Sequence, residues 1–217
     1  LFRIGGARQH DVGAVGAGLR EVDLTLALAQ RLQPMLEAYG LRVALTREDN
    51  RPLTAMSHRD PTERIRLEQE ARIAAVTPAR IYVSIHFNGH PNPGVRGTET
   101  YYNPDNFGAE SRRLAEALQA GILAELRGIG YEPLDRGVSD DRTAGKPYGH
   151  FFSLRGPQPS VLVEALFLSN PREAALLREP GTLDALARGY AAGITRYLAE
   201  DDAPAEHTGR APGAGIR

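Results

Sequence analysis

Apolar residues recur at two different spacings along this chain, and the two spacings predict different elements. Three stretches carry an apolar residue every three or four positions, which is typical of helices with one buried face. These helices are expected at residues 21–39, 109–127 and 183–198. Short apolar or alternating runs predict strands at residues 1–4, 41–46, 81–86, 98–102, 151–154 and 160–164. Two further helices are expected, one over residues 62–76 and a short one capped by Asn170.

The order of these elements predicts the fold class and the domain organisation. Strands that alternate with helices favour an α/β fold in which helices cover both faces of a sheet. Residues 1–199 are expected to form one domain of ordinary size. Residues 200–217 are polar and rich in Gly, Pro and Ala, which predicts a disordered tail. Residues 128–149 show no clear periodicity, so we expect a loop region beside the active site.

Composition and charge exclude several classes of function. The 26 basic and 27 acidic residues give a net charge of −1, so nothing favours a nucleic-acid partner. No apolar run is long enough to span a membrane. The chain has no cysteine, which excludes disulfides, thiolate ligands and cysteine nucleophiles. Lys146 is its one lysine, and we attribute this excess of arginine to the base composition of the source genome rather than to phosphate binding.

Three ionisable residues stand at the ends of predicted elements. Apolar runs lead into His86 and into Glu164, and Glu21 opens the first helix. Ligands bind at the C-terminal edge of open α/β sheets, and a buried charge there requires a partner or a metal. Histidine and carboxylate ligands with an open position are typical of catalytic zinc, and a further carboxylate can act as general base. We therefore predict Glu21 and His86 as zinc ligands and Glu164 as the base.

Each of these residues also has a structural interpretation. His86 could be a hydrogen-bonded residue of the core, and Glu21 could be an acid favoured by the helix dipole in the first turn. Glu164 could form a buried ion pair, for instance with Arg155. Arg47 and Asp49 are expected to form a salt bridge. Glu99 is expected to contact either substrate or a neighbouring arginine.

Six short strings occur in an order and at spacings that resemble one known family. One of them is Ser-Ile-His-Phe-Asn at residues 84–88, and another is Val-Glu-Ala-Leu-Phe-Leu-Ser-Asn at residues 163–170. The others lie at residues 11–16, 18–24, 45–49 and 96–102. Together they make the chain similar, up to about Leu198, to the zinc-dependent N-acetylmuramoyl-L-alanine amidases called amidase type 3.

The resemblance implies a fold, a reaction and a cellular location. It implies a mostly parallel twisted sheet flanked by helices on both faces. It also implies hydrolysis of the amide between N-acetylmuramic acid and the L-alanine of the stem peptide in peptidoglycan. By position, Glu21 and His86 match two of the zinc ligands of the family, and Glu164 matches its catalytic glutamate. We therefore expect a monomeric, extracytoplasmic enzyme with peptidoglycan as its partner and zinc as its cofactor.

The sequence departs from the family where the first zinc ligand is expected. That ligand is a histidine in an Asp-Pro-Gly-His-Gly-Gly string, and counting back without gaps from Asp11 places Ala7 at its position. Either the Asp-Pro-Gly-His part is absent, which we favour, or His10 replaces the missing ligand. If no histidine completes the set, zinc would be held weakly. The alternative function is then a catalytically inactive domain that binds peptidoglycan or regulates its cleavage.

Overall fold

A single mixed sheet forms the centre of the computed structural model, which describes residues 2–5, 13–51, 60–75 and 77–202. Its strands, in spatial order, are β4 (Val43–Leu45), β1 (Phe2–Gly5), β5 (Ile81–Asn88), β8 (Ser160–Phe167), β6 (Thr98–Tyr102) and β7 (Asp135–Asp140). Neighbouring strands pair in parallel, except β6 and β8, which are antiparallel. The prediction of a mostly parallel sheet is therefore confirmed.

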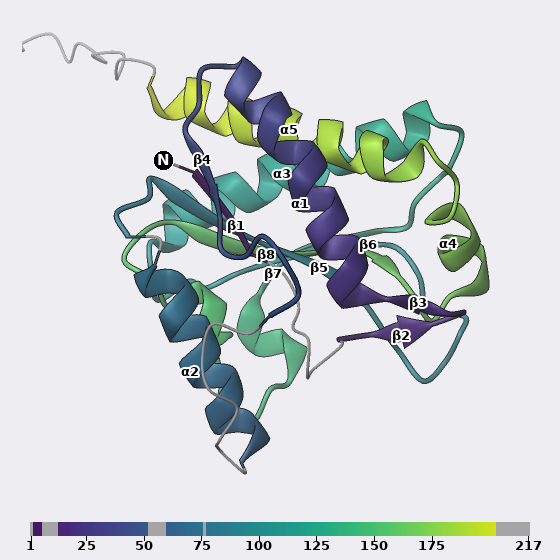
Figure 1. Cartoon of the computed structure of the whole chain (residues 1–217), viewed down its shortest axis with the longest axis horizontal. Coiled ribbons are helices and arrows are strands. Elements are labelled where there is room, and N and C mark those ends of the chain that lie inside the picture. Colours follow the sequence, from purple (N-terminus) through teal and green to yellow (C-terminus); the bar gives the residue numbers. More distant parts are fainter. Residues whose placement is uncertain (1, 6–12, 52–59, 76, 203–217) are drawn as a thin grey trace, which may run out of the picture.

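Helices lie on both sides of this sheet (Figure 1). One side carries α1 (Glu21–Ala38), α3 (Gly108–Gly128) and α5 (Thr182–Asp201), and the other carries α2 (Pro61–Ala74). The remaining described elements are the hairpin of β2 (Val15–Gly16) and β3 (Leu19–Arg20), the 3-10 helices η1 (Asp141–Ala144) and η2 (Phe152–Leu154), and α4 (Pro171–Leu176). Among the helices that the structure describes, none has the length and apolarity needed to cross a bilayer.

Burial in the core explains why the sequences of two strands are almost continuously apolar. Strands β5 and β8 are central in the sheet and covered on both faces, so almost all their side chains are buried. Leu28, Leu32 and Leu36 of α1 are fully buried at helical spacing. Helices α3 and α5 approach closely at Gly189, where a Cβ atom would lie only 2.7 Å from the Cα of Ile122. This packing holds β5 and β8 rigidly beneath the residues described below.

Two predictions of local structure are wrong. Residues 128–149 contain β7 and η1, not only loop. β7 lies at the edge of the sheet and is partly exposed, so its polar residues gave no apolar periodicity. Residues 151–154 form the turn of η2 instead of a strand, with the Leu154 amide donating to the Phe151 carbonyl over 3.0 Å.

The C-terminal boundary differs slightly from the expected one. Helix α5 continues to Asp201, so the residues expected to open the tail form its last turn. Residues 203–217 lie outside the described residues, and the disordered tail stays a prediction.

Candidate active site

His86 and Glu164 lie side by side on neighbouring parallel strands. They are register partners of β5 and β8, so both side chains leave the same face of the sheet. Both strands continue past these residues, to Asn88 and Phe167, which places the two groups inside the strands rather than at their ends. The regular pairing is interrupted between His86 and Asn88. The sheet therefore fixes the spacing between the imidazole and the carboxylate.

Glu21 is fixed by the loop that precedes α1. Its backbone amide donates to the Ala14 carbonyl over 3.0 Å, and its Oε2 accepts from the Ala14 amide over 2.7 Å. Gly13 has a φ of 65°, and a Cβ atom at this position would overlap the Glu21 carboxylate. Only glycine combines this conformation with so close an approach. The loop thus aims the Glu21 carboxylate at the sheet.

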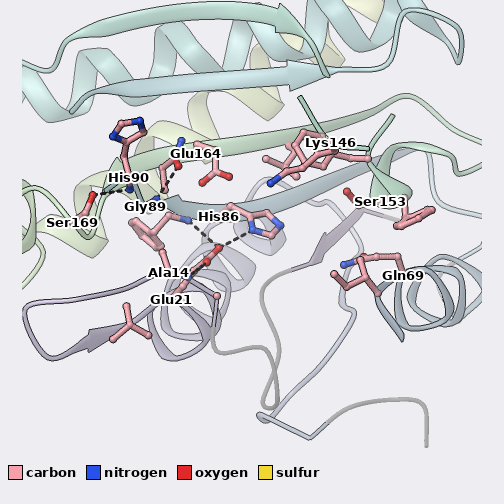
Figure 2. Close-up of a pocket in the computed structure, with 18 of the residues that line it drawn as sticks. Ala14, Glu21, Gln69, His86, Gly89, His90, Lys146, Ser153, Glu164 and Ser169 are labelled. Carbon is pink, nitrogen blue, oxygen red and sulfur yellow. Dashed lines mark hydrogen bonds and ion pairs between the residues drawn. The ribbon is translucent and has the colours of Figure 1, made fainter. Parts of the chain in front are cut away.

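The Glu21 carboxylate meets the His86 ring directly. Oε1 of Glu21 lies 2.7 Å from Nδ1 of His86, and it also accepts from the Phe87 amide over 3.3 Å (Figure 2). The Nε2 atom of His86 lies 3.0 Å from Oγ of Ser84. The fold therefore brings together the two residues that the sequence predicts as ligands, although they are 65 positions apart.

Glu164 is half-buried, and one of its carboxylate oxygens has no partner among the described residues. Its Oε2 atom is buried and has no hydrogen-bond partner within the described ranges. Burial raises the pKa of Glu164 to about 8, although the nearby His86 opposes the shift, because a charged carboxylate is poorly solvated there. The alternative of an ion pair with Arg155 is wrong, since Arg155 donates instead to the carbonyls of Tyr148 and His150.

Glu21, His86 and Glu164 all line one cavity of about 580 Å³. The segment around η2 also lines this cavity, with Tyr148, Phe151 and Phe152. The Tyr148 and Phe152 rings stack with their centroids 4.4 Å apart. A cavity of this size with a few convergent polar groups is typical of a binding site.

The donor set fits a zinc ion. One imidazole and one carboxylate in contact are the ligand types that catalytic zinc takes. The register neighbour of His86, Glu164, has a buried oxygen with no partner among the described residues, which a nearby cation would stabilise in its charged form. Both Ala7 and His10, the positions considered for the remaining ligand, lie outside the described residues.

Comparison with known proteins decides the family. The model of the Amidase_3 family of N-acetylmuramoyl-L-alanine amidases matches residues 5–196. This chain belongs to that family. It is 31% identical to the germination-specific N-acetylmuramoyl-L-alanine amidase of Bacillus subtilis over 198 residues, covering 90% of this chain and 78% of the relative. It is 32% identical to the amidase LytC of Bacillus subtilis, covering 91% of this chain but 35% of the longer relative.

Solved structures agree with this assignment. The CwlD amidase from Clostridioides difficile, solved in complex with the GerS lipoprotein, superposes with a TM-score of 0.76 at 27% identity and covers 92% of this chain and 98% of that one. The amidase AmiC2 of Nostoc punctiforme gives a TM-score of 0.67 at 27% identity, covering 91% and 96%. The family consists of zinc-using hydrolases of cell-wall peptidoglycan, and this chain is an N-acetylmuramoyl-L-alanine amidase.

Two other predicted contacts of the amidase can be checked. Glu99 pairs with a neighbouring arginine, as one alternative had it, with 2.7 Å between its Oε2 and Nε of Arg136. The prediction of a salt bridge between Arg47 and Asp49 is wrong, because the Asp49 carboxylate pairs with Arg51. Arg47 is instead buried, and it donates to the Val22 carbonyl over 2.7 Å, so it holds the first turn of α1.

A second histidine site in the amidase combines His150 with Asp140 and Asp141. Their ligand atoms lie within 4.8 Å of one another, close enough to hold a metal. Nδ1 of His150 lies 2.6 Å from Asp141, and its Nε2 lies 3.0 Å from Asp105. The other Asp141 oxygen accepts from the Phe151 amide, and Asp140 pairs with Arg142. Hydrogen bonds within the loop thus already occupy this group.

The sequence analysis did not predict three residues of the site. Gly13 and Ala14 shape the loop that holds Glu21, and the signal for them was the Gly-rich segment before the first helix. Lys146 lines the cavity, and its being the one lysine of the chain was the only signal for it.

Proposed function

We propose that this amidase cleaves the amide between the lactyl group of N-acetylmuramic acid and the L-alanine of the stem peptide. Glu21 and His86 are its zinc ligands, and Glu164 is its general base. Because peptidoglycan lies outside the cytoplasm, the enzyme acts outside the cytoplasm. That it is a monomer stays a prediction. The observation that carries the proposal is the buried Oε2 atom of Glu164, which has no partner within the described residues and belongs to the register neighbour of His86 in the Glu21–His86 contact.

The chemistry divides between the metal and the protein. When bound, zinc supplies a Lewis acid that polarises the scissile carbonyl and acidifies the attacking water. Glu164 takes the proton from that water and returns it to the nitrogen of the leaving amine. Its raised pKa near 8 describes the metal-free protein, and beside a cation the carboxylate would ionise at neutral pH. His86 and Glu21 are held in place by β5 and by the Ala14 loop, so the ligands need little rearrangement.

The decisive test replaces one atom of the base. Glu164→Gln should lower hydrolysis of purified peptidoglycan by about 10²–10⁴-fold, because a carboxamide cannot accept the proton, while zinc content stays unchanged. Glu99→Gln is the matched control, since Glu99 is the register partner of Glu164 on β6 but pairs with Arg136. Activity is followed by mass analysis of the released peptides. Wild-type activity in Glu164→Gln would refute the role of Glu164.

The inactive alternative has one motivation: the sequence shows no clear counterpart of the first zinc-ligand histidine of the family, and a count without gaps places Ala7 at its position. Metal analysis of the purified protein separates the two functions. About one tightly held zinc per chain supports the enzyme. A protein that binds peptidoglycan, holds no zinc and releases no peptide would be the inactive domain.

A further inference from the structure

Lys146 presents a cation to the cavity. It lies in the loop between η1 and η2 and lines the cavity together with Glu164 and His86. Figure 2 shows its amino group directed toward these two residues. The proposed reaction requires no lysine, so the presence of this side chain needs another explanation.

The amino group of Lys146 forms no ion pair in the part of the chain that the structure describes, although its charge acts on Glu164 and opposes the rise in the pKa of that carboxyl. The amino group also lies near the Phe151 ring, whose centroid is 5.9 Å from Nζ. Two arginines of the same region differ, because each is already bound within the loop. Arg142 pairs with Asp140 at 2.6 Å, and Arg155 donates to two backbone carbonyls at 2.8 Å each. Lys146 therefore remains available to an anionic ligand.

The loop around Lys146 is anchored, which gives the side chain a defined position. A turn closes where the Gly149 amide donates to the Lys146 carbonyl over 3.0 Å. The His150–Asp141 pair and the hydrogen bond from Arg155 to the His150 carbonyl then tie the following residues to the two ends of this segment. An anchored backbone lowers the entropy lost when a side chain binds a ligand.

The chemistry of the substrate indicates what this cation binds. The carboxyl of the lactyl group is consumed in the scissile amide, so free carboxylates near that bond belong to the peptide. From the position of Lys146 we infer that it binds a free carboxylate of the stem peptide and selects peptides in which this group is not amidated. This inference rests on the proposed function and adds a specificity-determining residue to it.

The test compares two soluble muramoyl peptides that differ only in whether the carboxyl group of the second residue is free or amidated. Wild-type enzyme should prefer the free acid by about tenfold in kcat/KM, the effect of one partly exposed charged hydrogen bond. In Lys146→Met the KM for the free acid should rise about tenfold with little change in kcat, and the preference should vanish. Lys146→Arg should restore most of it. Arg42→Met, which removes an exposed cation outside the cavity lining, is the matched control.

Calorimetric binding in the Glu164→Gln background provides a readout without turnover. Tighter binding of the free acid that depends on Lys146 supports the inference even if no bond is cleaved, in which case only the proposed function fails. Equal binding and cleavage of both peptides would overturn the inference and leave the amidase intact. A shifted pH profile in Lys146→Met without a change in KM would also overturn it, since Lys146 would then act only on Glu164. If neither peptide is bound or cleaved, both proposals are wrong.

Discussion

The domain contains two histidine–carboxylate pairs of nearly equal length in very different surroundings. His86 and Glu21 are 2.7 Å apart, and His150 and Asp141 are 2.6 Å apart. By distance alone, the His150 pair is the better metal candidate, because Asp140 adds a third ligand atom within 4.8 Å. Yet the family and the cavity both point to the His86 pair.

The difference lies in which polar atoms still need a partner. Around His150, both ring nitrogens, both Asp141 oxygens and the Asp140 carboxylate are engaged by protein groups, so a metal would have to displace existing bonds. The ring nitrogens of His86 and the oxygens of Glu21 are hydrogen-bonded too, but the Oε2 atom of neighbouring Glu164 is buried and has no partner among the described residues. Glu164 also lines a cavity. Convergent ligands therefore indicate a site only where they leave an unmet requirement and room for a ligand.

Replacing each of the two histidines in turn should give the largest difference between the two pairs. His86→Ala should lose the zinc and at least about 10³-fold in activity, because it removes a predicted ligand and with it the Lewis acid. His150→Ala should keep its zinc, because its ring is part of a hydrogen-bonded loop. The measurement is zinc per chain after dialysis against a weak chelator. The reverse result, with zinc lost only from His150→Ala, would move the metal site to the His150 cluster.

A smaller effect is expected from the glycine that supports Glu21. Gly13→Ala should weaken zinc binding by about 10- to 100-fold, because its Cβ atom would displace the Glu21 carboxylate. Gly130→Ala is the matched control, since Gly130 also has a positive φ, of 81°, but no atom lies within 4 Å of the added Cβ. Both variants share the strain of a left-handed alanine, about 1 kcal/mol. Equal zinc affinities in the two variants would show that the Gly13 contact does not matter for the metal.

Sequence patterns could predict some elements of the fold and not others. The long helices and the strands β5, β6 and β8 were predictable because burial imposes a regular spacing on their apolar residues. The partly exposed edge strand β7 and the turn of η2 were not, since neither carries such a spacing. Contacts with distant parts of the chain decide those segments.

The site was predictable to a similar degree. His86 and Glu164 stood out because an ionisable residue interrupts an apolar run, and Glu21 stood out because it opens the first helix; the family strings supported all three. Gly13, Ala14 and Lys146 did not stand out, because their roles depend on a loop approaching α1 and on a cavity wall. Neither arrangement leaves a periodic signal in the sequence.

The smallest expected effect is the pH dependence of the His150 pair. Burial disfavours the charged ring, but hydrogen bonds to Asp141 and Asp105 outweigh this and raise the pKa of His150 above its ordinary 6.5. A raised folded-state pKa stabilises the fold fully below the unfolded value, and the benefit is lost as the pH rises through the folded value. The pair should therefore stabilise the fold more near pH 6 than near pH 9.

Urea unfolding of the metal-free protein at both pH values measures this difference. His150→Ala should lower the free energy of unfolding more at pH 6 than at pH 9, because only the protonated ring pairs with two carboxylates. Asp105→Asn should give a smaller change of the same sign, below about 1 kcal/mol, because it removes only the largely exposed one of the two carboxylates. A loss in His150→Ala that is the same at both pH values would mean that the ring is neutral in the fold, and the loop would then be held by packing and neutral hydrogen bonds.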